Sequence, residues 1–400
     1  MSEWKEVNSS DYCYKITDGT HDSPKRCSDG RFLITSKHIK GTNIDFDNAY
    51  FISEEDYQKI IKRSKVDQWD VLISMIGEYC GFCHLEDSNN TEYAVKNVGI
   101  MKIGDEYKAK WLYYYLNSPK GKSQLFQSRA GSSQPYIALS ALRNLTIPVP
   151  NDLALSKIVE ILSRYDSLIE NYQKQIKLLE EAAQRLYKEW FVDLHFPGHE
   201  NTKIVDGVPE GWEKKKVNSI IELQSGFAFK SSTFDDNGAY KIVTIKNVKD
   251  GAFDGDNVSK IVAIPDKMPK HCILADGDIL LSLTGNVGRV CIVNGKNYLL
   301  NQRVAKLATG FKAFTYCLFR SRDMFIEVNN LANGAAQQNV SPIRIGEMKI
   351  LLPNSELLQE FESIVFKSIA RIISLQTQLR LLTEARDRLL PKLMSGEIEL

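Results

Sequence analysis

The sequence predicts an α+β protein, in which two similar globular domains of mixed α/β structure are separated by two long antiparallel coiled-coil helices. Two observations support this prediction. The chain repeats itself after about two hundred residues, and each copy ends in a long heptad pattern of apolar residues. We therefore expect a pseudo-twofold internal repeat, with globular domains at 1–150 and 197–352 and helices at 151–196 and 353–400.

The repeat is clearest just before each helix. A Gly-Ser-Ser-Gln sequence at 131–134 and the segment 145–151 recur, 203 positions later, as Gly-Ala-Ala-Gln at 334–337 and as 348–354. The same shift relates the far ends of the two helices, so we expect helices of equal length.

The globular parts repeat as well. Segment 69–77 corresponds to 277–285, and both contain Asp, three aliphatic residues and Ser, as buried strands often do. Segment 33–37 corresponds to 242–246. These pairs are 208 and 209 positions apart, so a small difference in length falls between them and the later repeat, as is typical of surface loops.

Each long helix carries apolar residues at alternating spacings of four and three, which favours a partner helix over packing on a domain core. Asn151 or Asp152 can cap the first helix, and Asn354 or Ser355 the second. About 36 helical residues span roughly 50 Å, which would suit a long ligand with two separated sites, such as duplex DNA. The positions expected to form the contact between the helices, or with a partner subunit, are Leu162, Ile169, Ile176, Leu179, Leu186, Trp190, Val365, Ile372, Leu379, Leu382 and Leu389.

Composition excludes several classes of protein. The net charge is +1, no apolar run reaches the length of a membrane span, and the seven cysteines come without a secretory signal. We therefore expect a cytoplasmic protein with reduced thiols and no membrane partner.

Catalytic signatures are missing from the sequence. The twelve prolines include no Pro-Pro pair, which an amino-methylating active site would need, and no Gly-x4-Gly-Lys-Ser/Thr phosphate loop occurs. Cys80, Cys83 and His84 match a haem-attachment pattern, yet the second copy keeps only Cys291, so we expect a structural role and no metal site.

Several motifs in a fixed order carry a resemblance to a known family. They are Asp-Gly-Thr-His at 18–21 with Gly-Phe-Ala-Phe-Lys at 226–230, the strands at 70–74 and 278–282 with their following glycines, and the helix endings at 186–198 and 389–398. Nearly the whole chain resembles the specificity subunit of type I restriction-modification enzymes, in which two target-recognition domains alternate with two conserved helices. One departure is the start of the first helix at 151–156, which lacks the Pro-Pro and Glu-Gln often seen there.

The resemblance implies a DNA-reading scaffold that has no catalytic residues and no cofactor of its own. Two modification subunits would dock along the helices and bring S-adenosylmethionine and the site that methylates adenine N6. Restriction subunits, which are motor-nucleases, would bring ATP and Mg²⁺. Each recognition domain would read one half of a split, asymmetric duplex target.

Residues that contact DNA are expected among polar loop positions placed similarly in both halves, because Asn, Gln, Arg and Lys distinguish base edges and lysines also position phosphates. The same loops could instead only shape turns before a strand. The candidates are Thr20, His21, Lys37, Ser132, Ser133, Gln134, Tyr136, Lys230, Lys246, Asn286, Gln337, Gln338 and Asn339.

Two other classes of function remain open at this point. A stand-alone DNA enzyme would need a catalytic constellation, which was not found in the sequence. A coiled-coil adaptor without DNA would explain the helices but not the repeated polar loops.

Overall fold

The computed structural model describes residues 4–41, 43–332 and 338–398, which form two compact units. The first unit comprises 1–167 and 383–400, and the second comprises 168–382. Each long helix therefore contributes one part to each unit. Among the described residues, no helix is long and apolar enough to cross a membrane.

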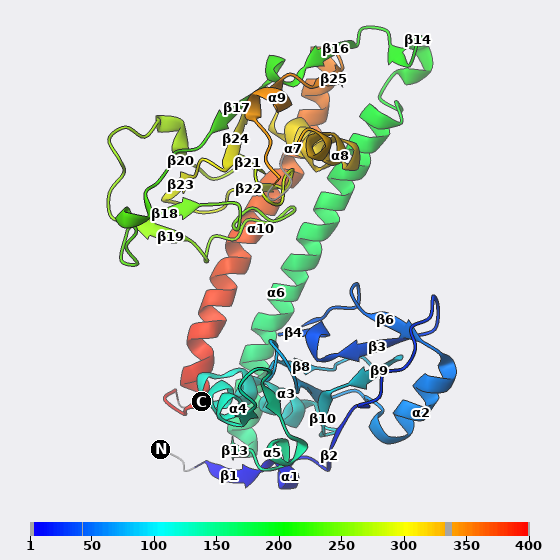
Figure 1. Cartoon of the computed structure of the whole chain (residues 1–400), viewed down its shortest axis with the longest axis vertical. Helices are drawn as coiled ribbons and strands as arrows, with labels where there is room; N and C mark the ends of the chain where they lie inside the picture. Colours follow the sequence, from blue (N-terminus) through cyan, green and yellow to red (C-terminus); the bar gives the residue numbers. More distant parts are fainter. Residues whose placement is uncertain (1–3, 42, 333–337, 399–400) are drawn as a thin grey trace. The chain divides into compact units, whose positions relative to one another are not determined.

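In the first unit, the sheet that carries most of the core is four-stranded and antiparallel, with the order β2-β10-β7-β8. A second sheet has the order β6-β3-β9, and its β3 and β9 run parallel. The elements are β1 (Lys5–Asn8), α1 (Ser9–Tyr12), β2 (Lys15–Asp18), β3 (Arg31–Thr35), η1 (Ser36–His38), β4 (Ile39–Lys40), β5 (Asn43–Ile44), β6 (Tyr50–Ile52), α2 (Glu54–Ser64), β7 (Asp70–Ser74), β8 (Cys83–Leu85), β9 (Tyr93–Lys96), β10 (Val98–Lys102), α3 (Glu106–Asn117), α4 (Pro119–Gln127), β11 (Arg129–Ala130), β12 (Tyr136–Ile137), α5 (Leu139–Arg143), β13 (Thr146–Val149) and the start of α6 (Asp152–Tyr187) (Figure 1).

The second unit repeats this arrangement. Its antiparallel sheet has the order β17-β24-β21-β22, and its second sheet, β19-β18-β23-β20, again contains one parallel pair, β18 with β23. The elements after α6 are the π-helical turn η2 (Lys188–Val192), η3 (His199–Asn201), β14 (Ile204–Val205), β15 (Val208–Pro209), β16 (Glu213–Lys216), η4 (Val217–Ser219), β17 (Ile221–Ser225), η5 (Ser231–Thr233), β18 (Tyr240–Val243), β19 (Ser259–Ile261), η6 (Lys270–Cys272), β20 (Ile273–Leu274), β21 (Ile279–Ser282), β22 (Val290–Ile292), β23 (Tyr298–Leu300), β24 (Val304–Thr309), α7 (Lys312–Arg320), α8 (Arg322–Asn330), α9 (Pro342–Gly346), β25 (Lys349–Leu352) and α10 (Ser355–Met394) (Figure 1).

The two long helices pair in opposite directions, as expected. In the first unit, Asp166 near the start of α6 accepts a bond from Arg386 near the end of α10, with 2.9 Å between Oδ1 and Nη1. In the second unit, the end of α6 and its π-helical continuation meet the start of α10, where Phe191 packs edge-on against Phe361 with ring centroids 4.9 Å apart. The helices have 36 and 40 residues, and Pro391 lies inside α10 without ending it.

The heptad positions on these helices differ in burial. Leu162, Trp190 and Val365 belong to the core of a globular part and are fully or almost fully buried, and Ile372 is fully buried as well. The other seven positions are half-buried, namely Ile169, Ile176, Leu179, Leu186, Leu379, Leu382 and Leu389, and of these Leu186 and Leu389 also pack against a globular core. A pair of helices covers only one side of each partner, so partial burial is the expected outcome of this packing.

Candidate nucleic-acid interface

The polar loops of the first unit lie where neighbouring strands of its antiparallel sheet begin or end. Strand β10 pairs Gly99 with Asp18 at the end of β2, and Val98 with Ser74 at the end of β7. The ends of β2 and β7 therefore lie beside the start of β10. Strand β9 of the second sheet also ends here, because only Asn97 separates it from β10.

Asn97 connects three loops at this place. Its backbone has a φ of 54°, in the left-handed region that asparagine tolerates better than most residues. Its N–H donates to Thr20 O at 3.2 Å, and its carbonyl accepts bonds from Met75 N at 3.2 Å and from Ser36 Oγ. Its side-chain oxygen lies 2.9 Å from His21 Nδ1, which fixes the exposed imidazole.

The loop after β7 is joined to the hairpin formed by β11 and β12. Gly77 N donates to Pro135 O, and Ile137 N donates to Met75 O, both at 2.9 Å. Gly131 has a φ of 83°, and a Cβ there would lie 2.7 Å from Gln134 O, so this position needs glycine. Ser132, Ser133 and Gln134 are exposed at the tip of the hairpin, and Tyr136 is 44% exposed beside them.

The second unit joins its corresponding loops in the same way. Gly285 N donates to Gln338 O, and Val340 N donates to Leu283 O, again both at 2.9 Å. Asn339 also accepts a bond from Thr284 Oγ1 at 2.8 Å, while the side chain of Gln338 is exposed. Gln337 lies outside the described residues.

Two candidate lysines occupy matching turns. In the first unit, Thr35 N donates to His38 Nδ1 at 3.0 Å, which leaves Lys37 exposed between buried neighbours. In the second, Thr244 N donates to Asn247 Oδ1 at 2.8 Å and leaves Lys246 exposed. Burial lowers the pKa of His38, and the charge of Lys37 lowers it further.

The other candidates are less closely tied to these loops. Asn286 is exposed next to Gly285, and its carbonyl accepts a bond from Ser282 Oγ. Lys230 is exposed before η5, where its carbonyl accepts a bond from Thr233 Oγ1 at 2.7 Å. Among the described residues, no hydrogen bond links Lys230 to the joined loops.

The sequence analysis missed two polar residues, which lie in the turns immediately before β10 and β24. Asn97 precedes β10, and Arg303 precedes β24 at the matching place, where its carbonyl accepts a bond from Leu283 N at 3.0 Å. Arg303 is exposed, and arginine is the side chain that most often reads guanine. The sequence contains no signal for this pair, because the difference in length between the two copies falls in this segment, and the match follows only from the strand pairing of Val98 with Ser74 and of Val304 with Ser282.

The motifs that carried the resemblance mainly build the frame. Asp70 Oδ2 accepts bonds from Asp67 N at 2.8 Å and Lys102 Nζ at 2.7 Å, and Asp278 Oδ2 accepts the matching bonds from Ala275 N and Lys306 Nζ. A Cβ on Gly19 or on Gly226 would lie 2.2 Å from a carbonyl oxygen of the neighbouring chain segment. These residues therefore stabilise the backbone to which the loops are attached.

Cys80 and Cys83 of the cysteine motif belong to the hydrophobic core of the first unit. Cys80 and Cys83 are buried, and burial raises the pKa of both thiols, that of Cys83 to about 12. Within the described residues, no group of three or more His, Cys, Asp or Glu residues could hold a metal ion.

Two units with corresponding sheets, the same backbone bonds between their loops and different exposed side chains beside those bonds define a duplicated recognition scaffold. The chain belongs to the family described as the type I restriction modification DNA specificity domain, whose model matches residues 1–181 and 209–383. It is a specificity subunit with a role in recognising DNA targets, a non-catalytic component that assembles with other subunits. This membership favours a DNA reader over the adaptor without DNA that the helices alone would allow.

Named relatives agree with this assignment. The chain is 29% identical over 306 residues to the type I restriction enzyme MjaIX specificity subunit of Methanocaldococcus jannaschii, covering 74% of this chain and 70% of that one. It is 28% identical over 301 residues to the MjaVIII specificity subunit of the same organism, covering 72% and 70%. The crystal structure of the type I restriction-modification system S subunit from M. genitalium has the same fold, with a TM-score of 0.62 and 17% identity over 98% of this chain and 96% of that one.

Proposed function

We propose that the chain reads a bipartite, asymmetric duplex DNA target, with one half read by the joined loops of each unit. The observation that carries this proposal is that the two units hold their loops with the same backbone bonds but carry different side chains on them. The same two backbone bonds join the loops in both, yet Tyr136 corresponds to Asn339 and Asn97 to Arg303. Loops with the same backbone arrangement but different side chains would read two different half-sites.

The exposed side chains have the chemistry for this task. Lys37 and Lys246 stand free of ion pairs among the described residues and would contact phosphates, which set position without reading sequence. Arg303, Gln338, Asn339 and Gln134 can hydrogen-bond to base edges in the major groove. The halves therefore offer different donors and acceptors at similar places.

Substitutions on the second unit test this division of roles. Lys246→Ala should weaken binding to all sequences alike and reduce the slope of log K against log salt by about 1. Arg303→Ala should cost about 1–3 kcal/mol on the target and relax specificity at one position of one half-site. Lys174→Ala, at an exposed position of α6, is the control and should change neither. Equal effects of Arg303→Ala on target and random DNA would contradict base reading.

We also propose that the two helices dock two modification subunits. Leu178 on α6 and Leu381 on α10 occupy equivalent positions of the repeat and are 54% and 51% exposed, each with an exposed alanine four residues on. On α6, Leu178, Ala182 and Leu186 line a shallow hollow of ≈330 Å³ together with charged neighbours. An apolar strip that occurs once on each helix fits two copies of one partner.

The modification subunits would bring S-adenosylmethionine and the chemistry that methylates adenine N6, and restriction subunits would add ATP- and Mg²⁺-dependent translocation and cleavage. Light scattering of the complex tests the docking strips. Leu178→Asp and Leu381→Asp should each reduce the bound modification subunits from two to one, and the double variant should bind none. Unchanged mass in the double variant would show that the strips do not form the interface.

A further inference from the structure

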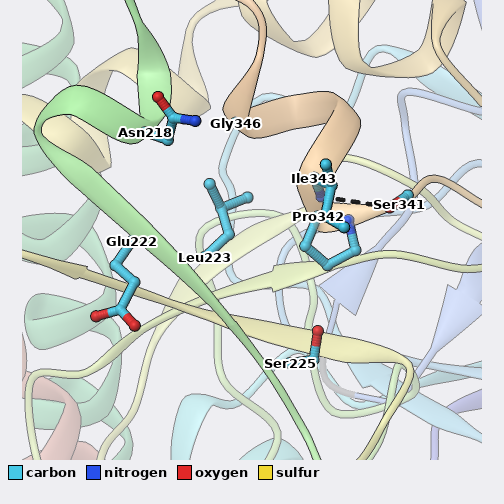
Figure 2. A pocket seen from close by; sticks show the side chains of 8 residues that line it. All are labelled: Asn218, Glu222, Leu223, Ser225, Ser341, Pro342, Ile343 and Gly346. Atoms are coloured by element: carbon cyan, nitrogen blue, oxygen red, sulfur yellow. Dashed lines mark hydrogen bonds between the residues drawn. The ribbon is translucent and has the colours of Figure 1, made fainter.

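The second unit contains a pocket of ≈390 Å³ between strand β17 and helix α9. Leu223 lies between Glu222 on one side and Pro342 with Ser341 on the other, and Ile343 stands at the rim (Figure 2). Ile343 is 77% exposed.

Strand β17 is the edge of its sheet, and Leu223 turns its backbone polar groups toward this pocket. Gly226 N donates to Val304 O, and in the antiparallel register of β17 with β24 the residues at even steps from Gly226, namely Gln224 and Glu222, bond to β24. The N–H and C=O of Leu223 therefore face away from β24. Among the described residues, no hydrogen bond reaches the Leu223 carbonyl, whereas the outward carbonyl of Ser225 accepts one from His271 Nε2 at 2.9 Å.

In the first unit, an arginine side chain bonds to the equivalent carbonyl. Helix α5 corresponds to α9 in the repeat, so Arg143 corresponds to Gly346, and Ile16 on the edge strand β2 corresponds to Leu223. Arg143 Nη2 donates to the outward carbonyl of Ile16 at 3.3 Å. In the second unit, Gly346 stands in place of this arginine, and no described side chain donates a hydrogen bond to the Leu223 carbonyl.

The charge at this place is also reversed. The residue before Ile16 is Lys15, whereas the residue before Leu223 is Glu222. A carboxylate, an open carbonyl and the hydroxyls of Ser225 and Ser341 make a set dominated by hydrogen-bond acceptors, which favours a cationic donor and disfavours phosphate. Pro342 and the exposed Ile343 offer an apolar surface to the stem of a long side chain.

We propose that this pocket receives the guanidinium group of an arginine side chain from a modification subunit, in the position that Arg143 occupies within the first unit. Guanidinium is planar and presents several N–H groups at once, so it can donate to the Leu223 carbonyl while its charge is balanced by the Glu222 carboxylate, one oxygen of which already accepts a bond from Gln224 Nε2 at 2.9 Å. The strand after the pocket, β25, leads directly into α10, the helix that carries the proposed docking position Leu381. The choice of partner rests on the proposed docking of modification subunits, but the guanidinium site itself does not.

A small probe tests the site on the full chain alone. N-acetyl-arginine methylamide should bind in a saturation-transfer NMR titration at least about tenfold more tightly than the lysine analogue. Gly346→Arg should abolish this binding by filling the pocket, although a Cβ there lies 3.3 Å from Asn218 Cβ and requires a small shift. Glu222→Lys, on the surface, should abolish it without any such shift. The double variant Lys15→Glu with Arg143→Gly should gain a second site in the first unit.

Assembly tests the partner. Gly346→Arg and Glu222→Lys should each raise the Kd for the modification subunit about tenfold, while both variants bind DNA as the native chain does. Equal binding of the arginine and lysine probes, or unchanged binding in both variants, would overturn the guanidinium site. An unchanged Kd for assembly would overturn the assignment of the partner. Failure of the native chain to assemble at all would instead count against the proposed docking function.

Discussion

Phe361 anchors the start of α10 against the end of α6, and removing its ring tests how the second unit holds the two helices together. The side chain has no exposed surface. Its ring centroid lies 4.9 Å from that of Phe191, 5.7 Å from that of Trp190 and 6.3 Å from that of Tyr187. Replacement of a buried phenylalanine by alanine costs about 3–5 kcal/mol, because the lost contacts are joined by the cost of the cavity.

The assay is urea denaturation followed by tryptophan fluorescence, to which Trp190 contributes a direct signal from this cluster. Phe361→Ala should lower the free energy of unfolding of the second unit by about 3–5 kcal/mol. Phe366→Ala on the same helix is the matched control, because Phe366 is 46% exposed and its loss should cost less than about 0.5 kcal/mol. A loss below about 1 kcal/mol for Phe361→Ala, or equal losses for the two variants, would refute the claim that this aromatic cluster holds the helices.

Three further predictions concern pH, catalysis and helix length. Because the pKa of His38 is lowered in the folded state, the unfolded chain binds more protons below about pH 6.5, so the stability of the first unit should fall on acidification. His38→Asn, which installs the residue that the second unit uses at Asn247, should flatten this fall between pH 7.5 and 5.5 in urea titrations, and an unchanged slope would contradict the assignment. The purified chain alone should neither transfer a labelled methyl group to DNA nor cut it, and labelled DNA in the absence of other subunits would disprove this. Inserting one heptad after both Leu179 and Leu382 lengthens each helix by about 10 Å. Sequencing of methylated sites should then show a non-specific spacer between the two half-sites that is longer by about three base pairs. An unchanged spacer with full activity would show that the helices do not set its length.

Much of the fold is predictable from the sequence because it depends on period and repetition. Heptad spacing predicts the long helices, and the matched segments predict two units with the same strands. The depth of burial along the helices is not predictable in this way. Leu162 and Val365 are buried because they also belong to the cores of the globular parts, whereas Leu179 belongs to neither core and is only half-buried.

The candidate interface is predictable only in part. The repeated polar loops indicate Tyr136 and Asn339, and Lys37 with Lys246, as equivalent pairs. The role of Asn97 could not be predicted, because it depends on three loops that are far apart in the sequence and meet at one residue with a positive φ. Arg303 has no motif of its own and becomes a candidate only through the register of β24.

The pocket beside β17 shows a further limit. Gly346 in place of the Arg143 of the first copy reads as an ordinary difference between repeats. Only the pairing of β17 with β24 shows that the change leaves the Leu223 carbonyl open at a sheet edge.

Exchange of one recognition domain tests the central claim most directly. Residues 1–150 would be replaced by the corresponding domain of a related specificity subunit, and the methylated sites would be sequenced in cells that carry the complete three-subunit system. Because each unit has its own sheets, core and joined loops, one half of the recognised sequence should change while the other half keeps its bases. A change in both halves, or in neither, would contradict the claim that each unit reads its own half of the target.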